Sequence, residues 1–125
     1  MNDFISFEQF ACLLDEIANN LPKEIYIRLN GGVNLQPGLK IHPDSIANDL
    51  FTLGEYNYNE LGRYINIYYG SFSRTYWGLS EKALRTEIER VLKHEFMHHL
   101  ESLAGEDDLE VEDAIFLEKY RRGLL

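Results

Sequence analysis

Residues 80–105 read SEKALRTEIERVLKHEFMHHLESLAG, and this segment provides the framework of the chain. Ser80 is a favoured residue for the start of a helix, and Gly105 is a favoured residue for its end. Between them, apolar residues recur at intervals of three and four, which predicts one long amphipathic helix with a single buried face. That face consists of Leu84, Ile88, Val91, Leu92, Phe96, Leu100 and Leu103.

The same helix carries the string His94-Glu95-Phe96-Met97-His98, an HExxH motif. Residues four apart on a helix share a face and lie about 5–6 Å apart, so both imidazoles can bind one tetrahedral ion. Glu95 is rotated one residue from that face, so its carboxylate can reach a water on the metal without being a ligand. The motif therefore predicts one Zn²⁺ ion held by His94 and His98, with Glu95 as the catalytic base.

The N-terminal third of the chain predicts scaffold elements. Ser6 and Gln9 form a capping box, and apolar residues at helical spacing follow, which predicts a first helix from Phe7 to Leu21. Residues 24–29 alternate between polar and apolar side chains and predict a strand. Residues 33–50 carry turn residues without a sustained period, so we expect an irregular crossing there.

The middle of the chain predicts a hairpin. Two aromatic and β-branched runs, residues 50–58 and 63–69, are separated by Asn59-Glu60-Leu61-Gly62. Residues 70–78 are expected to form a loop into the long helix, and a shorter helix is expected from about Leu109 to Arg121. This order predicts an α+β fold in which a short mixed sheet packs on the long helix, with further helices at both ends.

Length and composition predict one globular domain spanning residues 1–125, with 45% hydrophobic residues to form its core. A single cysteine, Cys12, permits no internal disulfide and favours a reducing compartment such as the cytoplasm; beside the apolar stripe of the first helix, it predicts a half-buried thiol. The sequence has neither a signal-peptide pattern nor an apolar run of 18 residues. We therefore expect a cytoplasmic protein without a membrane partner, and the sequence favours no particular oligomeric state.

The net charge of -9 is concentrated after the HExxH motif. Residues 101–118 contain eight acidic residues and no lysine or arginine. Such a segment attracts cations and repels phosphate backbones, so nucleic acid is not expected as a partner. The same repulsion argues against a zinc endoribonuclease, the other hydrolase class that is compatible with histidines on a helix.

Beyond the motif itself, the chain resembles the small bacterial zincin-like metallopeptidase family. The resemblance rests on the HExxHH string from His94 to His99, the Gly54-Glu55-Tyr56 turn and the run from Arg63 to Tyr68, and it spans nearly the whole chain. It implies a minimal zincin-like domain, with a short sheet lying on the helix of the active site. It also implies hydrolysis of a peptide or protein substrate by a water that the metal activates.

Members of that family often follow the pattern HExxHxxGxxD, in which the Asp is the third metal ligand. This chain departs from the pattern, because Glu101 replaces the Gly and Ala104 replaces the Asp. Gly105 to Asp108 offers a GxxD displaced by four residues, so Asp108 is the expected third ligand. The alternatives remain open: Glu101, which suits a hydrogen-bond acceptor for a histidine N–H better than a ligand, and the downstream Glu110, Asp113 and Glu118.

Only 27 residues follow His98, which leaves little chain to build the second wall of a cleft. Two functions therefore stay open: a zinc metallopeptidase, and a metal-binding or partner-binding domain of little activity in which zinc is structural. A peptide substrate is expected to lie extended against an exposed edge of the hairpin. The candidate donors to its carbonyl oxygen are Tyr68, Tyr69, Tyr76 and Tyr120.

Overall fold

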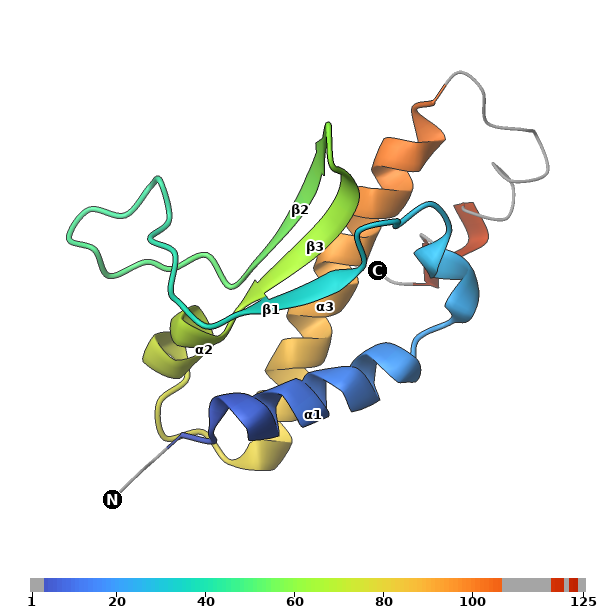
Figure 1. Ribbon diagram of the computed structural model, residues 1–125. Helices are drawn as coiled ribbons and strands as arrows, with labels where there is room; N and C mark the ends of the chain where they lie inside the picture. Colours follow the sequence, from blue (N-terminus) through green and yellow to red (C-terminus); the bar gives the residue numbers. More distant parts are fainter. Residues whose placement is uncertain (1–3, 107–117, 121, 124–125) are drawn as a thin grey trace.

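The computed structural model describes residues 4–106, 118–120 and 122–123 (Figure 1). Along the chain, the elements are α1 (Phe7–Asn19), the 3₁₀ helix η1 (Lys23–Tyr26), β1 (Val33–Gln36), β2 (Gly54–Asn59), β3 (Gly62–Tyr68), α2 (Tyr69–Thr75) and α3 (Glu81–Ala104). The fold is α+β, as the order of sequence patterns predicted.

Both long helices begin where their capping residues predicted, and α3 also ends there, whereas α1 ends at Asn19, two residues before the expected Leu21. Ser6 and Gln9 form the complete capping box of α1. The Ser80 side chain accepts a hydrogen bond from the Ala83 N–H at the start of α3, and Gly105 is its C-cap. All seven residues of the predicted apolar face of α3 are buried. Local sequence therefore specifies both helices, because caps and apolar spacing agree with each other.

The sheet has three strands in the order β1-β3-β2. β3 pairs in parallel with β1 and antiparallel with β2, so the sheet is mixed and the hairpin of the sequence analysis is confirmed. Burial alternates along β3, with Arg63, Ile65 and Ile67 facing inward. Because β3 is central, β2 and β1 carry the two edges of the sheet.

The sheet and α1 pack against different parts of α3 (Figure 1). α1 crosses the N-terminal half of α3, where Glu16 and Arg85 form an ion pair at 2.6 Å. The sheet lies along the middle and the C-terminal half of α3, with β2 beside the helix. Among the described residues, eighteen buried hydrophobic side chains form one core, most of them from α1, β3 and α3 and the others from η1, α2 and the connecting segments.

The strand predicted for residues 24–29 is wrong, because this segment forms η1 and a turn. Its buried residues, Ile25 and Leu29, are four apart, which is a helical spacing and not the spacing of a strand. Tyr26 packs edge-on against Phe96 of α3, with ring centroids 4.8 Å apart. Arg28 then adopts a positive φ of 58°, which ends the helical turn. Tertiary packing has therefore overridden an alternating pattern.

Two short elements were missed by the sequence analysis. β1 lies within the segment 33–50 that was expected to be irregular, and its four residues are too few to show a period. α2 occupies most of the segment 70–78 that was expected to be a loop, and it buries Phe72 completely. Both elements are stabilised by contacts with distant residues, such as the pairing of Val33 with Ile65.

Three findings concern Cys12, the C-terminal segment and membrane spans. Cys12, expected to be a half-buried thiol, is exposed on α1, because it lies outside the buried stripe of that helix. Of the short helix expected from Leu109 to Arg121, residues 118–120 are helical, whereas 109–117 and 121 lie outside the described residues. Among the helices that the structure describes, none combines the length and the apolar character needed to cross a membrane.

Candidate metal centre and cleft

His94 and His98 lie one turn apart on the exposed side of α3 and face each other. Their Nε2 atoms are 3.0 Å apart, and the ring planes meet at 86°. Two nitrogens that bind one tetrahedral Zn²⁺ at about 2.0–2.1 Å would be about 3.3 Å apart, so this pair is close to the spacing of ligation. The donor set fits zinc, because neutral imidazoles are among its preferred ligands.

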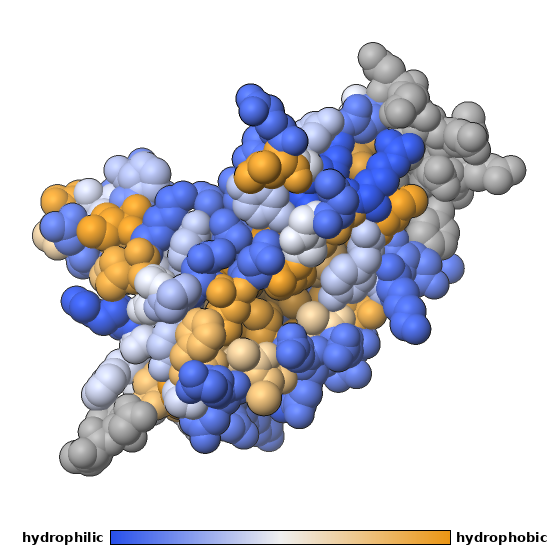
Figure 2. Space-filling view, viewed as in Figure 1, coloured by the Kyte–Doolittle hydropathy of each residue, from blue (hydrophilic) through white to orange (hydrophobic). Residues whose placement is uncertain are grey.

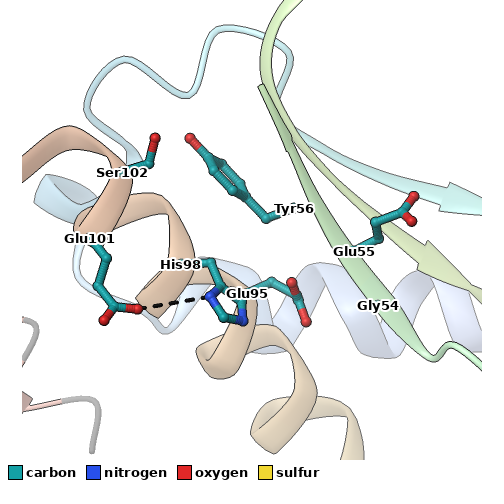
Figure 3. A pocket seen from close by; sticks show the side chains of 7 residues that line it. All are labelled: Gly54, Glu55, Tyr56, Glu95, His98, Glu101 and Ser102. Carbon is teal, nitrogen blue, oxygen red and sulfur yellow. Dashed lines mark ion pairs between the residues drawn. The ribbon is translucent and has the colours of Figure 1, made fainter. Parts of the chain in front are cut away.

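Glu95 lies beside the two imidazoles but is turned toward β2. Ligand atoms of His94, Glu95 and His98 lie within 4.8 Å of one another, and over the part of the chain that the structure describes this is the one group with metal-site geometry. The Glu95 side chain is only 7% exposed, and Figure 3 shows its carboxylate pointing toward Gly54 and Glu55. Burial raises the pKa of Glu95, while His94 and the backbone N–H of Tyr56 lower it in part. A buried carboxylate with a raised pKa is suited to accept and return a proton near neutral pH.

Gly54 permits β2 to approach α3 at this point. A Cβ atom at position 54 would lie 2.8 Å from Cγ1 of Val91 and 3.2 Å from Cγ of Glu95. Both distances are shorter than an ordinary contact, so any larger residue would push the strand from the helix. The absence of a side chain at Gly54 is therefore what brings the Glu95 carboxylate to the edge of the sheet.

His99, the residue after the HExxH motif, is completely buried and serves a different purpose from His94 and His98. Its Nε2 lies 2.7 Å from the Ile27 carbonyl oxygen, and its Nδ1 lies 2.9 Å from the Tyr56 hydroxyl. A carbonyl oxygen can only accept, so Nε2–H donates to Ile27 and Nδ1 accepts from Tyr56. Burial lowers the pKa of His99, which keeps this ring neutral. His99, a residue of α3, therefore links this helix to β2 and to the end of η1.

Arg63 continues this buried network from the opposite side of Tyr56. Its guanidinium donates to the Tyr56 hydroxyl at 2.8 Å and to the Ser102 hydroxyl, and it forms an ion pair with Glu106. It also lies 3.7 Å above the ring of Tyr58. An arginine side chain in a sheet core needs such partners, because an unpaired buried charge is costly. Arg63 thus fixes β2 and β3 against the C-terminal end of α3.

A cleft follows the junction of β2 and α3 and has two lobes that share Gly54, Glu55 and Glu95. The lobe beside His98, which we call the His98 lobe, has a volume of about 770 Å³ (Figure 3). Its lining comprises Gly54, Glu55, Tyr56, Glu95, His98, Glu101 and Ser102.

The lobe beside His94, which we call the His94 lobe, has a volume of about 390 Å³. Its outer wall comes from residues 42–53, which precede β2 in the chain. The second wall of the cleft is therefore built from the segment before β2, and the short chain after His98 does not limit it. The lining of this lobe comprises His42, Pro43, Phe51, Thr52, Leu53, Gly54, Glu55, Arg90, Val91, His94 and Glu95.

The carboxylates considered as third ligands lie in different places. Glu101 Oε1 is 3.8 Å from Nδ1 of His98 (Figure 3), whereas Nε2 of the same ring faces His94. Glu118 accepts a hydrogen bond from Arg122 at 3.0 Å. Asp108, Glu110 and Asp113 lie outside the described residues. Among the described carboxylates, Glu101 thus lies beside His98 and outside the group formed by His94, Glu95 and His98.

None of the four tyrosines considered as donors to the substrate lines the cleft. The hydroxyl groups of Tyr68, Tyr69 and Tyr76 donate to Glu55, to the Ile5 carbonyl oxygen and to Glu87. Tyr120 hydrogen-bonds Glu24 of η1. The tyrosine that does line the cleft is Tyr56, which the sequence analysis treated as part of a strand. Its role depends on a contact with His99, 43 residues away, and no local pattern in the sequence signals that contact.

The chain is similar in sequence and in structure to a protein whose structure has been solved. The solved structure of a conserved hypothetical protein from Thermus thermophilus is 32% identical in sequence and superposes with a TM-score of 0.68. The match covers 82% of this chain and 100% of the other. No family model and no curated protein matches the chain. The similarity therefore extends over the full length of the relative, and its name states no activity.

Proposed function

The chain belongs to the same family as the conserved hypothetical protein from Thermus thermophilus, and we propose that it is a zinc-dependent metallopeptidase with a minimal zincin-like domain. One observation carries the proposal. Two imidazole Nε2 atoms lie 3.0 Å apart beside a carboxylate that is buried at the free edge of a β-sheet. This arrangement combines two metal ligands, a base and a place for an extended substrate.

His94 and His98 would hold the metal through Nε2. When bound there, zinc would act as a Lewis acid that lowers the pKa of a coordinated water to about 7. Glu95 takes a proton from water as the water oxygen bonds to the carbonyl carbon of the substrate. Glu95 then gives that proton to the amide nitrogen as the C–N bond breaks, so the proton taken from water ends on the amine product. The burial that raises the pKa of Glu95 favours this exchange.

The substrate would pair with β2. β3 is hydrogen-bonded on both sides, whereas β2 has no strand on its outer edge among the described residues. The Tyr56 N–H already points away from β3, because it donates to Glu95. An extended peptide on this edge would pass directly over the two histidines and would gain main-chain hydrogen bonds. Of the two strands of the hairpin, we therefore propose β2 as the one that pairs with the substrate.

We propose that Asp108 is the third metal ligand. A carboxylate would complete a site of two histidines and one oxygen and leave the fourth position for water. Glu101 is assigned instead to the His98 ring: its carboxylate lies 3.8 Å from Nδ1, which is longer than a hydrogen bond, and a small rotation of the side chain would let it accept the Nδ1–H and orient the ring. The variant Asp108→Asn should bind zinc at least tenfold more weakly, and Glu112→Gln, in the same acidic segment, is its control.

Replacement of Glu95 by Gln is the central test. Glu95→Gln should keep one zinc per chain, measured by elemental analysis, and should lose hydrolysis of an unstructured protein by at least a hundredfold. Glu89→Gln has the same change of charge on the same helix, but Glu89 pairs with Lys93 on the surface, and this control should keep full activity. Hydrolysis retained by Glu95→Gln would remove Glu95 from the mechanism, and a wild-type chain without zinc would end the proposal.

The alternative is a metal-binding or partner-binding domain with little activity. It is supported by the exposure of His94 and His98, since an open site excludes water poorly. Thermal unfolding with and without a chelator separates a structural ion from a catalytic one. We expect the chelated protein to remain cooperatively folded, because the hydrophobic core is complete without an ion. Loss of the fold on chelation would support the alternative.

A further inference from the structure

We infer that the His94 lobe is a subsite for an apolar side chain of an unfolded polypeptide. The inference rests on the proposed function and specifies the class of substrate. Within the lobe, Pro43, Phe51, Leu53 and Val91 present apolar side chains around an opening that continues into the candidate active site. Its volume of about 390 Å³ lies within the range of ligand pockets, about 300–1,000 Å³.

Apart from its two histidines, this lobe has three ionisable side chains: Glu55 and Glu95, which also line the His98 lobe, and Arg90, which is already paired. Arg90 pairs with Glu87 at 2.9 Å and donates to the Tyr76 hydroxyl at 3.1 Å. Its guanidinium is therefore held by a residue of its own helix and by the tyrosine that ends α2, and it is not directed to an acidic side chain of a substrate. Among the residues that line the His94 lobe and not the His98 lobe, four are apolar (Pro43, Phe51, Leu53 and Val91), and we infer that these four contact the side chain of the substrate.

The His98 lobe has the opposite character. The residues that line it and not the His94 lobe are all polar, namely Tyr56, His98, Glu101 and Ser102, and the hydroxyl of Tyr56 is engaged with His99. Although Lys40 pairs with Glu55, Glu101 lies half exposed beside His98. Burial of an apolar side chain against such groups would remove their hydration without compensation. The two lobes therefore differ, and an apolar residue is expected on the His94 side of the reacting bond.

The segment that walls the His94 lobe also exposes apolar residues. We call residues 39–51 the arm; it projects from the body of the molecule, and apolar surface gathers on it in Figure 2. Its exposed fractions are 40% for Leu39, 44% for Ile41, 98% for Ile46 and 46% for Leu50.

The arm has a defined backbone. The His42 N–H donates to the Leu50 carbonyl oxygen, the Thr52 N–H donates to the Lys40 carbonyl oxygen, each at 2.8 Å, and Ile41 pairs with Phe51. We infer that this apolar surface, held on a hydrogen-bonded segment, is a second contact area for the same substrate.

The length of β2 sets the minimum length of the substrate. β2 has six residues and is about 20 Å long, so a peptide that covers it and enters the His94 lobe needs more than six residues. Folded proteins bury their apolar side chains and seldom offer an extended strand of that length. The combination of a free edge, an apolar subsite and an apolar arm therefore selects segments of unfolded proteins and not dipeptides or polar loops.

Peptide binding tests this inference independently of hydrolysis. Zinc-loaded Glu95→Gln protein is titrated with fluorescent ten-residue peptides built from Ser, Thr and Gln, in which a single Phe or a single Asp is moved through each position. We expect Phe at one position to tighten binding at least tenfold over Ser, and Asp at that position to give no gain. A Phe51→Ser substitution should abolish the preference, and Pro43→Ser, at an exposed position of the same lobe, should weaken it.

The matched control is Leu61→Ser, which removes a 78%-exposed leucine from the β2–β3 turn and should leave the preference intact. Equal affinity for Phe, Ser and Asp peptides, or no measurable binding by any of them, would overturn the inference. So would a preference that survives Phe51→Ser and Pro43→Ser. Hydrolysis without side-chain preference would overturn only this inference, whereas apolar-selective binding by a protein that never hydrolyses would overturn only the proposed function.

Discussion

The phenolic hydroxyl of Tyr56 lies 2.9 Å from Nδ1 of His99, and this contact joins the edge strand to the long helix directly behind the candidate metal centre. The ring of Tyr56 also packs on that of His99, with centroids 5.3 Å apart. The backbone N–H of the same tyrosine donates to Glu95. One residue of β2 thus contacts both Glu95, the candidate base, and the helix that carries the two candidate ligands.

Removal of the Tyr56 hydroxyl should therefore destabilise the protein. Tyr56→Phe leaves Nδ1 of His99 and one N–H of Arg63 without a partner in the core, and we expect the free energy of unfolding to fall by about 1–3 kcal/mol. Tyr64→Phe is the control, because its hydroxyl only accepts from the Asn59 amide near the surface. Urea unfolding of both variants gives the comparison, and equal stability of the two would contradict the structural role of Tyr56.

A methyl group at position 54 should separate strand from helix. We expect Gly54→Ala to lower the free energy of unfolding by about 1–3 kcal/mol, because Val91 and Glu95 must move away from the new Cβ. It should also reduce hydrolysis, since the Glu95 carboxylate moves with them. Gly38→Ala, where a new Cβ meets no atom within 4 Å, should be close to neutral by the same denaturant assay. Unchanged stability of Gly54→Ala would show that β2 and α3 are not tightly packed at this position.

Stability should fall as the protein is acidified through the range in which His99 would normally titrate. Burial holds the pKa of His99 below its usual value of about 6.5, so just below that pH the unfolded chain binds more protons than the folded one. The stability that neutral His99 contributes is therefore complete above about pH 6.5 and is lost as pH falls toward the lower folded pKa.

Urea unfolding of the chelated protein, from about pH 7.5 to about pH 5, measures this loss without a contribution from metal release. His99→Gln should flatten the pH dependence in that window. His42→Gln, at a partly exposed histidine, should leave it unchanged. An identical slope for the wild type and His99→Gln would show that other groups cause the acid sensitivity.

Neutralising Glu101 should weaken zinc binding without abolishing it. With Nε2 of His98 on the metal, its Nδ1–H would lie on the side of the Glu101 carboxylate, which is 3.8 Å from Nδ1 and can close to a hydrogen bond by a small rotation; loss of such a partner typically costs 10–100-fold in metal affinity. We expect Glu101→Gln to bind zinc about tenfold more weakly in competition with a chromophoric chelator. Glu89→Gln should match the wild type. A complete loss of binding would instead make Glu101 a direct ligand.

The sequence alone determined the elements whose signals are local. The start, end and buried face of α3 follow from Ser80, Gly105 and the apolar spacing between them, because helix hydrogen bonds join residues only four apart. The positions of His94, Glu95 and His98 on that helix follow from the same periodicity. The hairpin was also predictable from its two aromatic and β-branched runs, although its turn has two residues, Glu60 and Leu61, in place of the four expected, and Gly62, with a φ of 101°, begins β3.

The tertiary structure decided everything that depends on contacts between distant residues. β1 exists because Val33 pairs with Ile65, residues 23–26 form η1 because Ile25 and Tyr26 pack inward, and the second wall of the cleft comes from residues 42–53. The approach of Gly54 to Glu95 likewise joins residues 41 positions apart. Such contacts carry no periodic signal, because their energy comes from burial and polar pairing that exist only once the sheet lies on the helix.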